Sequence, residues 1–406
     1  KPKIRFKGYT DDWEQRKLNE IADKVTEKNK NNKFSEPFTN SAEQGIISQK
    51  DYFDREIVND ENLNGYYIVR KDDFIYNPRI SVTAPVGPIN RNRLGRNGVI
   101  SPLYTVFRTH DIDNLYLEFY FKTTKWHRFM KLNGDSGARF DRFTISSTQF
   151  MEMPIPYPTL EEQRKIGAYF ESLDTLITLH QRKCEETKKL KKYMLQKMFP
   201  QNGQTVPEIR FAGFTDAWEQ RKLEVFGKAT GGTSIESEFS EDGIYKVISI
   251  GSYSENSVYN DQGIRAIKSD KTSNRVLNQN DLTMILNDKT TSGNIIGRVL
   301  LIEESGIYVY NQRTERIEIN LDEYDPVFLY EMLNAPNIRE KIIKQAQGNT
   351  QIYVNWTAIS LLEYMIPSKE EQVKIGEYLH SISNLITLHQ HKYEQLQSMK
   401  KFMLQN

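Results

Sequence analysis

The chain repeats its own frame, and this repeat constrains the fold more than any other feature. Residues 4–18 return as residues 209–223, and both copies contain the run Trp-Glu-Gln-Arg-Lys-Leu. Residues 161–196 match residues 370–405 at 21 of 36 positions, whereas the sequence between these ends differs in the two halves. The period is far longer than the roughly 20 to 50 residues of a solenoid unit. It therefore indicates a duplicated unit that consists of a domain and a helix. Because the middle segments of the two copies differ in sequence, we expect the copies to recognise two different targets.

Composition places the chain among globular proteins. Its 406 residues are 38% hydrophobic, with a mean hydropathy of −0.65, which is enough for two domain-sized cores. The single cysteine, Cys184, excludes a disulfide framework and a thiolate metal cluster, and it fits a reducing cytoplasm. No run of 18 apolar residues suggests a membrane span, and the charged start has no signal-peptide core.

The net charge of +1 hides an uneven distribution. Residues 74–110 contain no Asp or Glu, and neither do residues 119–134 or 341–362. Such stretches suit phosphate contacts, and Arg and amide side chains on loops can also bond base edges. A solvated basic face is about as compatible with one such run. The candidate DNA-binding residues are Arg79, Arg91, Asn92, Arg93, Arg96, Lys122, Lys125 and Arg139 in the first half, and Lys268, Lys271, Arg275, Lys344, Gln347, Asn349, Gln351 and Tyr353 in the second.

Each half has the same predicted order of parts. Short β-like runs such as residues 66–69 and 245–250 come first. Helical patterns follow at residues 115–132 and 326–347, and each half then has a glycine turn and a proline-ended strand. The fold class is therefore α+β, with two pseudo-symmetric domains of mixed short strands and helices.

Two long helices close the halves. Apolar residues recur there at alternating steps of four and three, which predicts a coiled-coil stripe. A helix of 36 residues is about 54 Å long, so a pair forms a rigid strut. The histidines are expected to be hydrogen-bonded and to set the register, because no ligand-spaced acid or thiolate accompanies them. The stripe consists of Ile166, Phe170, Leu173, Ile177, His180, Cys184 and Thr187, and of Ile375, Leu379, Ile382, Ile386, His389, Tyr393 and Leu396; the first five of each are the candidate coiled-coil and partner residues.

With the stretches 160–166 and 369–375 opening these helices after proline-rich strands, the chain resembles the specificity subunit of Type I restriction-modification enzymes over its whole length. The resemblance implies that residues 1–158 and 201–367 are target recognition domains, each reading one half of a bipartite DNA site. Residues 159–200 and 368–406 would form antiparallel spacer helices, whose outer surfaces and Glu-Glu-Gln entrances dock partners. It further implies two modification subunits, which use S-adenosylmethionine to methylate adenine, and restriction subunits, which use ATP and Mg²⁺.

The residues themselves favour a chain without catalysis or cofactor of its own. Asn77-Pro78-Arg79 lacks the second proline and the aromatic residue of an amino-methyltransferase loop. Gly227-Lys228 lacks the upstream glycine and the following hydroxyl of an ATP-binding loop. The basic stretches lack the carboxylates of a metal nuclease. Two alternatives stay open, namely the DNA-binding subunit of a related bifunctional restriction-methylation system and a coiled-coil scaffold that binds no nucleic acid.

Overall fold

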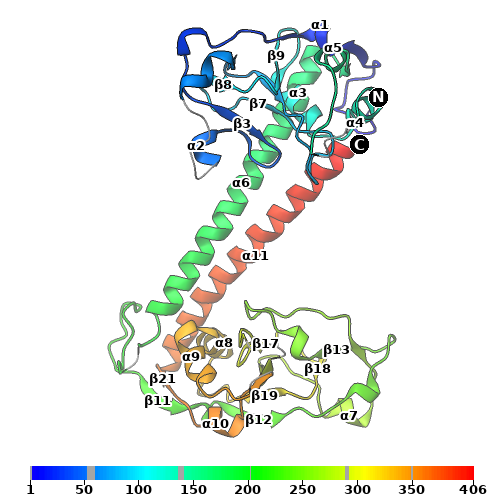
Figure 1. The fold of residues 1–406 in the computed structure, drawn as a ribbon. Helices are drawn as coiled ribbons and strands as arrows, with labels where there is room; N and C mark the ends of the chain where they lie inside the picture. Colours follow the sequence, from blue (N-terminus) through cyan, green and yellow to red (C-terminus); the bar gives the residue numbers. More distant parts are fainter. Residues whose placement is uncertain (1, 53–59, 136–140, 202, 289–291, 349–350) are drawn as a thin grey trace. The chain divides into compact units, whose positions relative to one another are not determined.

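The computed structural model describes residues 2–52, 60–135, 141–201, 203–288, 292–348 and 351–406 (Figure 1). The chain divides into two compact units. Unit 1 comprises Lys1–His180 and His391–Asn406, and unit 2 comprises Gln181–Gln390. Each unit therefore contains one globular domain together with parts of both long helices.

Unit 1 is built on a four-stranded antiparallel sheet in the order β2-β9-β6-β7. Helices α3, α4 and α5 pack on it through a core that includes Phe74, Phe107 and Phe150. Smaller antiparallel pairs, β3 with β4 and β5 with β8, complete the domain. The elements are β1 (Glu14–Lys17), α1 (Leu18–Ile21), β2 (Ala22–Lys24), η1 (Lys30–Asn32), β3 (Phe38–Ser41), β4 (Gly45–Ser48), α2 (Gln49–Tyr52), η2 (Asp60–Gly65), β5 (Tyr67–Val69), β6 (Phe74–Tyr76), β7 (Ile89–Arg91), β8 (Gly98–Ile100), β9 (Thr105–Thr109), α3 (Asn114–Phe121), α4 (His127–Asn133), α5 (Ser147–Met151) and β10 (Pro154–Tyr157).

Unit 2 repeats the central sheet as β12-β19-β15-β17, again antiparallel. It adds a three-stranded sheet, β14-β13-β18, in which β13 and β18 are parallel. The elements are β11 (Glu219–Lys222), η3 (Leu223–Val225), β12 (Gly227–Gly231), η4 (Glu236–Glu238), β13 (Tyr245–Ile248), η5 (Ile250–Ser252), β14 (Arg265–Ala266), α7 (Asp270–Ser273), β15 (Leu282–Ile285), β16 (Asn287–Asp288), β17 (Val299–Leu301), β18 (Tyr308–Tyr310), β19 (Thr314–Ile319), α8 (Pro326–Asn334), α9 (Pro336–Ile343), β20 (Ile352–Tyr353), α10 (Trp356–Ser360) and β21 (Glu363–Ile366).

The repeated sequence motifs form the joint between domain and helix in each unit. The Glu-Gln-Arg-Lys strand β1 pairs with the proline-ended strand β10, and β11 pairs with β21 in the same antiparallel way. Helix α6 (Leu160–Lys197) follows β10, and helix α11 (Lys369–Gln405) follows β21. The mixed α+β class, the two pseudo-symmetric domains and the two long helices are thus confirmed.

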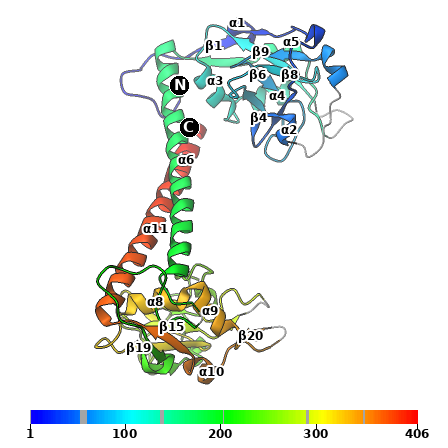
Figure 2. The same cartoon turned by 90° about the vertical axis from the view of Figure 1, so that its left-hand side faces the viewer.

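A hydroxyl side chain caps the first turn of each long helix. The Glu162 N–H donates to Thr159 Oγ1 at 3.3 Å, and the Glu371 N–H donates to Ser368 Oγ at 3.4 Å. A side-chain oxygen at this position satisfies one of the free N–H groups of the first turn. Figure 2 shows the two helices as long single ribbons.

The two helical patterns expected between the strands are each divided in the structure. Residues 326–347 contain α8 and α9, because Pro336 forces Ala335 into an extended conformation between them. Residues 115–132 span most of α3 and of α4, which are separated by a turn in which Trp126 Nε1 donates to the Phe121 carbonyl at 3.0 Å. The expected strand 245–250 ends at Ile248 and continues as the short helix η5.

The long helices pack on each other and on their domains. In unit 1, Phe170 and Leu173 of α6 share a cluster with Phe119 of α3 and with Leu396 and Met403 of α11. In unit 2, a larger cluster joins the start of α11 and the end of α6 to α8; its helix residues include Ile375, Leu379, Met194, Leu195 and Phe328. Each unit therefore buries the stripe against two surfaces, the opposing helix and the domain.

Candidate nucleic-acid interface

An arginine of each N-terminal motif locks the domain to the start of its long helix. Arg5 Nε and Nη2 donate to the two carboxylate oxygens of Glu162 at 2.7 and 2.8 Å. Arg210 donates to Glu371 at the same two distances. Both glutamates are buried, with exposures of 0%. A two-bond contact of this kind fixes orientation as well as distance.

The neighbouring glutamines serve the same joint. Gln163 Oε1 accepts from the Asp113 N–H, and its amide donates to the Pro158 carbonyl. Gln372 makes the equivalent bonds to the Asp325 N–H and the Pro367 carbonyl. The expectation that the whole Glu-Glu-Gln entrance docks partners is therefore wrong for its second and third residues, because both are buried inside their own unit.

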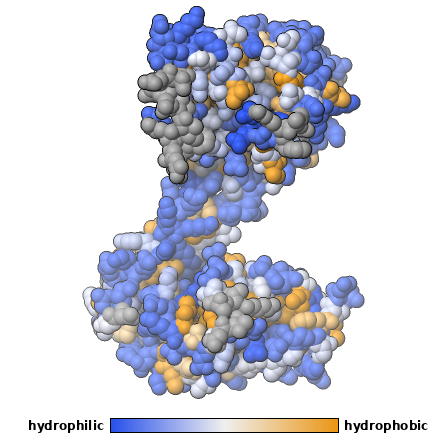
Figure 3. All heavy atoms as spheres, viewed as in Figure 1, coloured by the Kyte–Doolittle hydropathy of each residue, from blue (hydrophilic) through white to orange (hydrophobic). Residues whose placement is uncertain are grey.

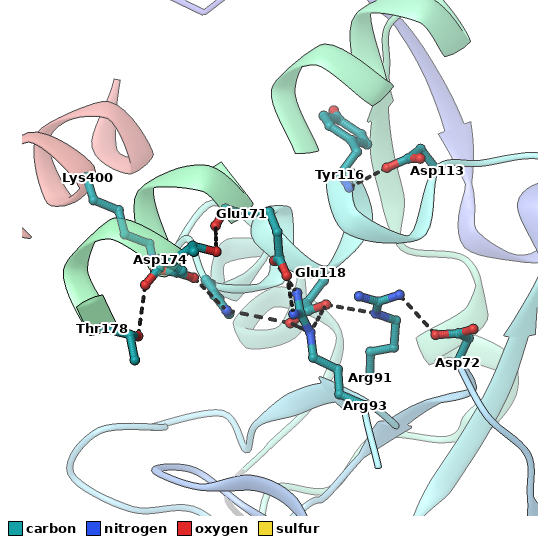
Figure 4. A network of polar contacts seen from close by, with 12 residues as sticks. Asp72, Arg91, Arg93, Asp113, Tyr116, Glu118, Glu171, Asp174, Thr178 and Lys400 are labelled. Carbon is teal, nitrogen blue, oxygen red and sulfur yellow. Dashed lines mark hydrogen bonds and ion pairs between the residues drawn. The ribbon is translucent and has the colours of Figure 1, made fainter. Parts of the chain in front are cut away.

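A carboxylate at the centre of unit 1 gathers several of the predicted DNA-binding cations (Figure 4). Glu118 on α3 accepts from Arg91 Nε at 2.8 Å and from Arg93 Nε at 2.8 and 2.9 Å. Asp72 accepts from Arg91 Nη1 at 3.0 Å on the other side. The Arg91 side chain is only 11% exposed, so it holds the β7 strand end against α3.

The same network continues onto the long helices of unit 1. Arg93 Nη1 and Nη2 donate to the carboxylate of Glu171 on α6, both at 2.8 Å. Hydrogen bonding to Arg93 lowers the pKa of Glu171, and hydrogen bonding to Glu171 raises the pKa of Arg93. Lys122 Nζ lies 3.5 Å from Glu118 and 3.7 Å from Asp174, and Asp174 also pairs with Lys400 of α11. The loop with the predicted base-reading arginines is thus tied to the helices.

Two further predicted residues of this loop are also held within the unit. Arg96 makes a two-bond contact with Glu36 at 2.7 and 2.8 Å. Asn92 is fully buried, and its amide donates to the Arg70 and Arg96 carbonyls, both at 2.9 Å. Asn92 therefore shapes the loop from inside, and a role for it in base contact does not fit its burial.

Arg79 and Lys125 differ from the other described cations predicted in unit 1, because no carboxylate in the described part of the chain pairs with them. Both are exposed, and neither side chain has an ion pair within the described residues. Arg139 lies outside the described residues. Figure 3 shows one face of the molecule as mainly hydrophilic, with apolar residues scattered among polar ones.

In unit 2 the predicted residues fall into two groups. The first lies on and around the short helix α7. Lys268 is exposed, whereas Lys271 Nζ donates to Ser237 Oγ at 2.9 Å and lies 3.5 Å from Glu238. Arg275 is bound internally, since it donates to the Gly231 carbonyl at 2.9 Å and to the Tyr310 hydroxyl at 3.0 Å. Only Lys268 of the three is therefore presented without such a contact in the described part of the chain.

The second group follows α9 and forms a polar turn. Gln347 and Tyr353 bond each other through both backbone N–H groups, each at 2.9 Å to the other's carbonyl. Both side chains are exposed, as is that of Gln351 between them, and Lys344 pairs with Glu340 at 2.9 Å. Asn349 belongs to the same segment but lies outside the described residues. The turn thus presents amide and phenol groups from one short segment.

The predicted helix stripe lies inward as a whole. Phe170, Leu173, Ile375, Leu379 and Ile382 are buried. The others, Ile166, Ile177, His180, Ile386 and His389, are partly buried. Cys184, the next stripe position in α6, is also buried, and its Sγ lies 3.5 Å from Gln390 Oε1. Cys184 and Gln390 show that the helices are in direct contact in unit 2.

Sequence reasoning missed the carboxylates that bind these cations. Glu118 lies between the apolar residues Leu117 and Phe119 of α3. A charged residue in such a place indicates a buried ion-pair partner. A different isolated carboxyl lies in unit 2, where burial raises the pKa of Glu315 on β19 to about 7.

Within the described ranges, no cluster of His, Cys, Asp or Glu could hold a metal ion, and no helix is long and apolar enough to span a bilayer.

Comparison with known proteins agrees with the duplicated frame. A family model described as the type I restriction modification DNA specificity domain matches residues 10–189 and again residues 215–398. The MjaVIII type I restriction enzyme specificity subunit of Methanocaldococcus jannaschii is 25% identical over 370 residues, which cover 84% of this chain and 85% of that protein. A putative MjaX specificity subunit from the same organism is 23% identical over 264 residues, covering 64% and 59% of the two chains.

A solved structure has the same fold. The S subunit of a type I restriction-modification system from M. genitalium superposes with a TM-score of 0.60 at 12% sequence identity, covering 99% of this chain and 97% of that one. The two stretches that the family model matches together cover more than half of the chain. The chain therefore belongs to the type I restriction-modification DNA specificity family.

Proposed function

We propose that this chain is the DNA-reading subunit of a type I restriction-modification complex in the cytoplasm, without catalysis of its own. Each domain reads one half of a bipartite site, and the long helices set the distance between the halves. The observation that carries this proposal is the repeated lock of Arg5 on Glu162 and of Arg210 on Glu371. It holds two different domains on two nearly identical helix starts.

Phosphate contacts position such a protein, whereas base-edge contacts define the sequence it reads. In unit 1, Arg79 and Lys125 are exposed and pair with no carboxylate in the described part of the chain, and we assign them to DNA. In unit 2, we assign Lys268 and Lys344 to phosphates, and the exposed side chains of Gln347, Gln351 and Tyr353 to bases. We leave Arg91 and Asn92 out, because their polar groups are used inside the domain.

The partner surface is proposed on the long helices, because apolar exposure there is duplicated. Leu176 and its repeat equivalent Leu385 are 41% and 47% exposed. Leu190 and Met399 are 42% and 37% exposed, and Tyr193 and Phe402 are 47% and 57% exposed. Exposed apolar residues at equivalent positions favour two copies of one partner. We propose that these are two modification subunits that use S-adenosylmethionine, joined by restriction subunits that use ATP and Mg²⁺.

Exchange of one domain tests the function directly. Residues 19–153 are replaced by the corresponding segment of a relative, and the methylated sites are mapped in a host that carries the modification subunit. One half of the recognised sequence should change, while the other half and the spacer persist. A simultaneous change of both half-sites contradicts two independent readers. Failure to retard any duplex, with and without the modification subunit, favours the coiled-coil scaffold instead.

A further inference from the structure

Two arginines of unit 1 lie directly opposite each other on neighbouring extended segments. The residues that follow β6 form a short antiparallel bridge with the residues that precede α5, and this bridge pairs Arg79 with Arg142. Two backbone hydrogen bonds flank the pair, from the Ile80 N–H to the Asp141 carbonyl at 3.0 Å and from the Phe143 N–H to the Pro78 carbonyl at 2.8 Å. Arg79 and Arg142 are therefore a non-hydrogen-bonded pair, the kind in which opposing side chains come closest.

Neither guanidinium has an acidic partner among the described residues. Arg79 is exposed and Arg142 is partly buried. Asp141 precedes Arg142, but side chains alternate along an extended segment, so Asp141 shares the side of the buried Phe143, away from the pair. The other arginines of residues 74–110 all bind carboxylates, namely Arg91, Arg93, Arg96 and Arg108. Because like charges directly opposite each other destabilise a strand pair, Arg79 and Arg142 favour an anion from outside the chain.

The same bridge occurs in unit 2, where it presents neutral side chains. Arg142 and Tyr353 occupy the same repeat position, five residues after Gly137 and Gly348. Strands β16 and β20 place Asn287 opposite Tyr353. The N–H of the residue after Tyr353 again donates to the carbonyl of the residue before Asn287, at 2.9 Å. The bridge thus belongs to the repeated frame, whereas the pair of cations on it belongs to unit 1.

We propose that Arg79 and Arg142 together bind one phosphate group of the DNA that unit 1 reads, an inference that rests on the proposed recognition function. A guanidinium donates two parallel hydrogen bonds to a phosphate, and a phosphate between two guanidiniums replaces their repulsion by attraction. Arg142 lies outside the acid-free stretches of the sequence, so only its pairing with Arg79 identifies it. The contact positions unit 1 on the DNA backbone and selects no base.

The first test counts the phosphates that the pair neutralises. The complex of this chain with the modification subunit is titrated with a duplex that carries its methylated site, at several salt concentrations. The double variant Arg79→Ala, Arg142→Ala should reduce the slope of log K against log salt by about one, the value for one phosphate, whereas two separate phosphates would give about two. The matched control is Arg70→Ala, which removes an exposed arginine already paired with Glu27 and should leave the slope unchanged.

The variant Arg142→Glu separates DNA binding from folding. It places opposite charges across the bridge, so the thermal unfolding midpoint of unit 1, followed by hydrogen exchange of its peptides, should rise by about 2 °C. The same variant should bind the duplex at least as weakly as the double alanine variant, because its carboxylate repels the phosphate. A lower midpoint together with unchanged DNA affinity would show that the arginines serve the fold alone, and would overturn the proposal.

Three further results would overturn it. They are an unchanged salt slope in the double alanine variant, a slope reduced by about two, and a change in the bases of one methylated half-site, which would make the contact one to a base edge. Each of these leaves the recognition function in place, because the unaltered and Arg70→Ala complexes still bind the duplex. An unaltered complex that retards no duplex would instead contradict the recognition function, and this proposal with it.

Discussion

The two units hold the starts of their long helices by the same ion pair. They differ in the acid that pairs with the lysine of the opposing long helix. In unit 1, Lys400 pairs with Asp174, which belongs to α6 itself. In unit 2, the equivalent Lys191 pairs with Glu331 of α8 at 2.8 Å and donates to Ser383 Oγ at 2.6 Å. Ser383 occupies the repeat position of Asp174. The lysine is thus present in both units, whereas its acidic partner lies on the long helix in unit 1 and on the domain in unit 2.

This difference separates what the frame requires from what it tolerates. The lock of arginine on buried glutamate is identical in both units, because a buried carboxylate needs a fully matched partner. The lysine needs only some nearby acid, so different residues supply it. Four predictions test how far the likeness of the units extends.

The largest effect is expected when unit 2 loses the side chain that closes its core. Phe199→Ala should lower the free energy of unfolding of unit 2 by about 3 to 5 kcal/mol, because it removes a buried ring and leaves a cavity. Unfolding is followed by hydrogen exchange of peptides from each unit. Phe402→Ala, on an exposed side chain of α11, is the control and should cost little. Equal losses for the two substitutions would contradict the burial of Phe199.

The second prediction concerns the lock. Glu371→Ala should destabilise unit 2 by about 3 kcal/mol, because Arg210, whose side chain is 14% exposed, loses both hydrogen bonds to the buried carboxylate. Glu162→Ala should cause a comparable loss in unit 1. The exposed neighbours Glu161→Ala and Glu370→Ala serve as controls. Denaturant unfolding resolved by unit measures all four, and a loss confined to one unit breaks the symmetry of the frame.

The third prediction is a pH dependence of unit 2 that arises from a residue with no acidic counterpart at the equivalent position of unit 1. Burial raises the pKa of Glu315 to about 7, against a favourable influence of Arg275 on the charged form. The folded unit therefore prefers the neutral acid. Its contribution to stability is complete below the unfolded pKa near 4.5 and is lost as the pH rises through 7. The strand register places Thr105 at this position in unit 1.

The measurement compares the unfolding midpoint of unit 2 between pH 5 and pH 8. The loss should be about 2 kcal/mol, and Glu315→Gln should flatten the profile. Glu318→Gln, on an exposed side chain of the same strand, should keep the slope. A slope that persists in Glu315→Gln would assign the pH dependence to another group.

The smallest effect is expected on DNA affinity. Lys125→Ala should reduce the slope of log K against log salt by about one, as for the loss of one phosphate contact. Lys122→Ala should leave the slope unchanged, because Lys122 already faces Glu118 and Asp174. Binding of the assembled complex to its duplex at several salt concentrations measures both. Equal slopes for the two variants would place Lys125 off the DNA surface.

The frame was predictable from the sequence because its signals are local or repeated. The duplicated ends, the apolar stripe and the proline-ended strand before each long helix indicated two α+β domains and two helices. The breaks at Ala335 and Trp126 were not foreseen, since one depends on the effect of a proline on its neighbour and the other on an indole bonded to the end of the preceding helix.

The charged surface could not be predicted from the sequence. Residues 74–110 contain no acid, yet Arg91, Arg93, Arg96 and Arg108 all pair with carboxylates from other segments. An acid-free stretch fixes the charge of a segment, but electrostatic pairing acts through space over a few ångströms. The sequence by itself determined the repeated scaffold, because helix and strand patterns are read along the chain. Only the tertiary structure decided which cations stay accessible, because the acids that neutralise them lie up to 78 residues away.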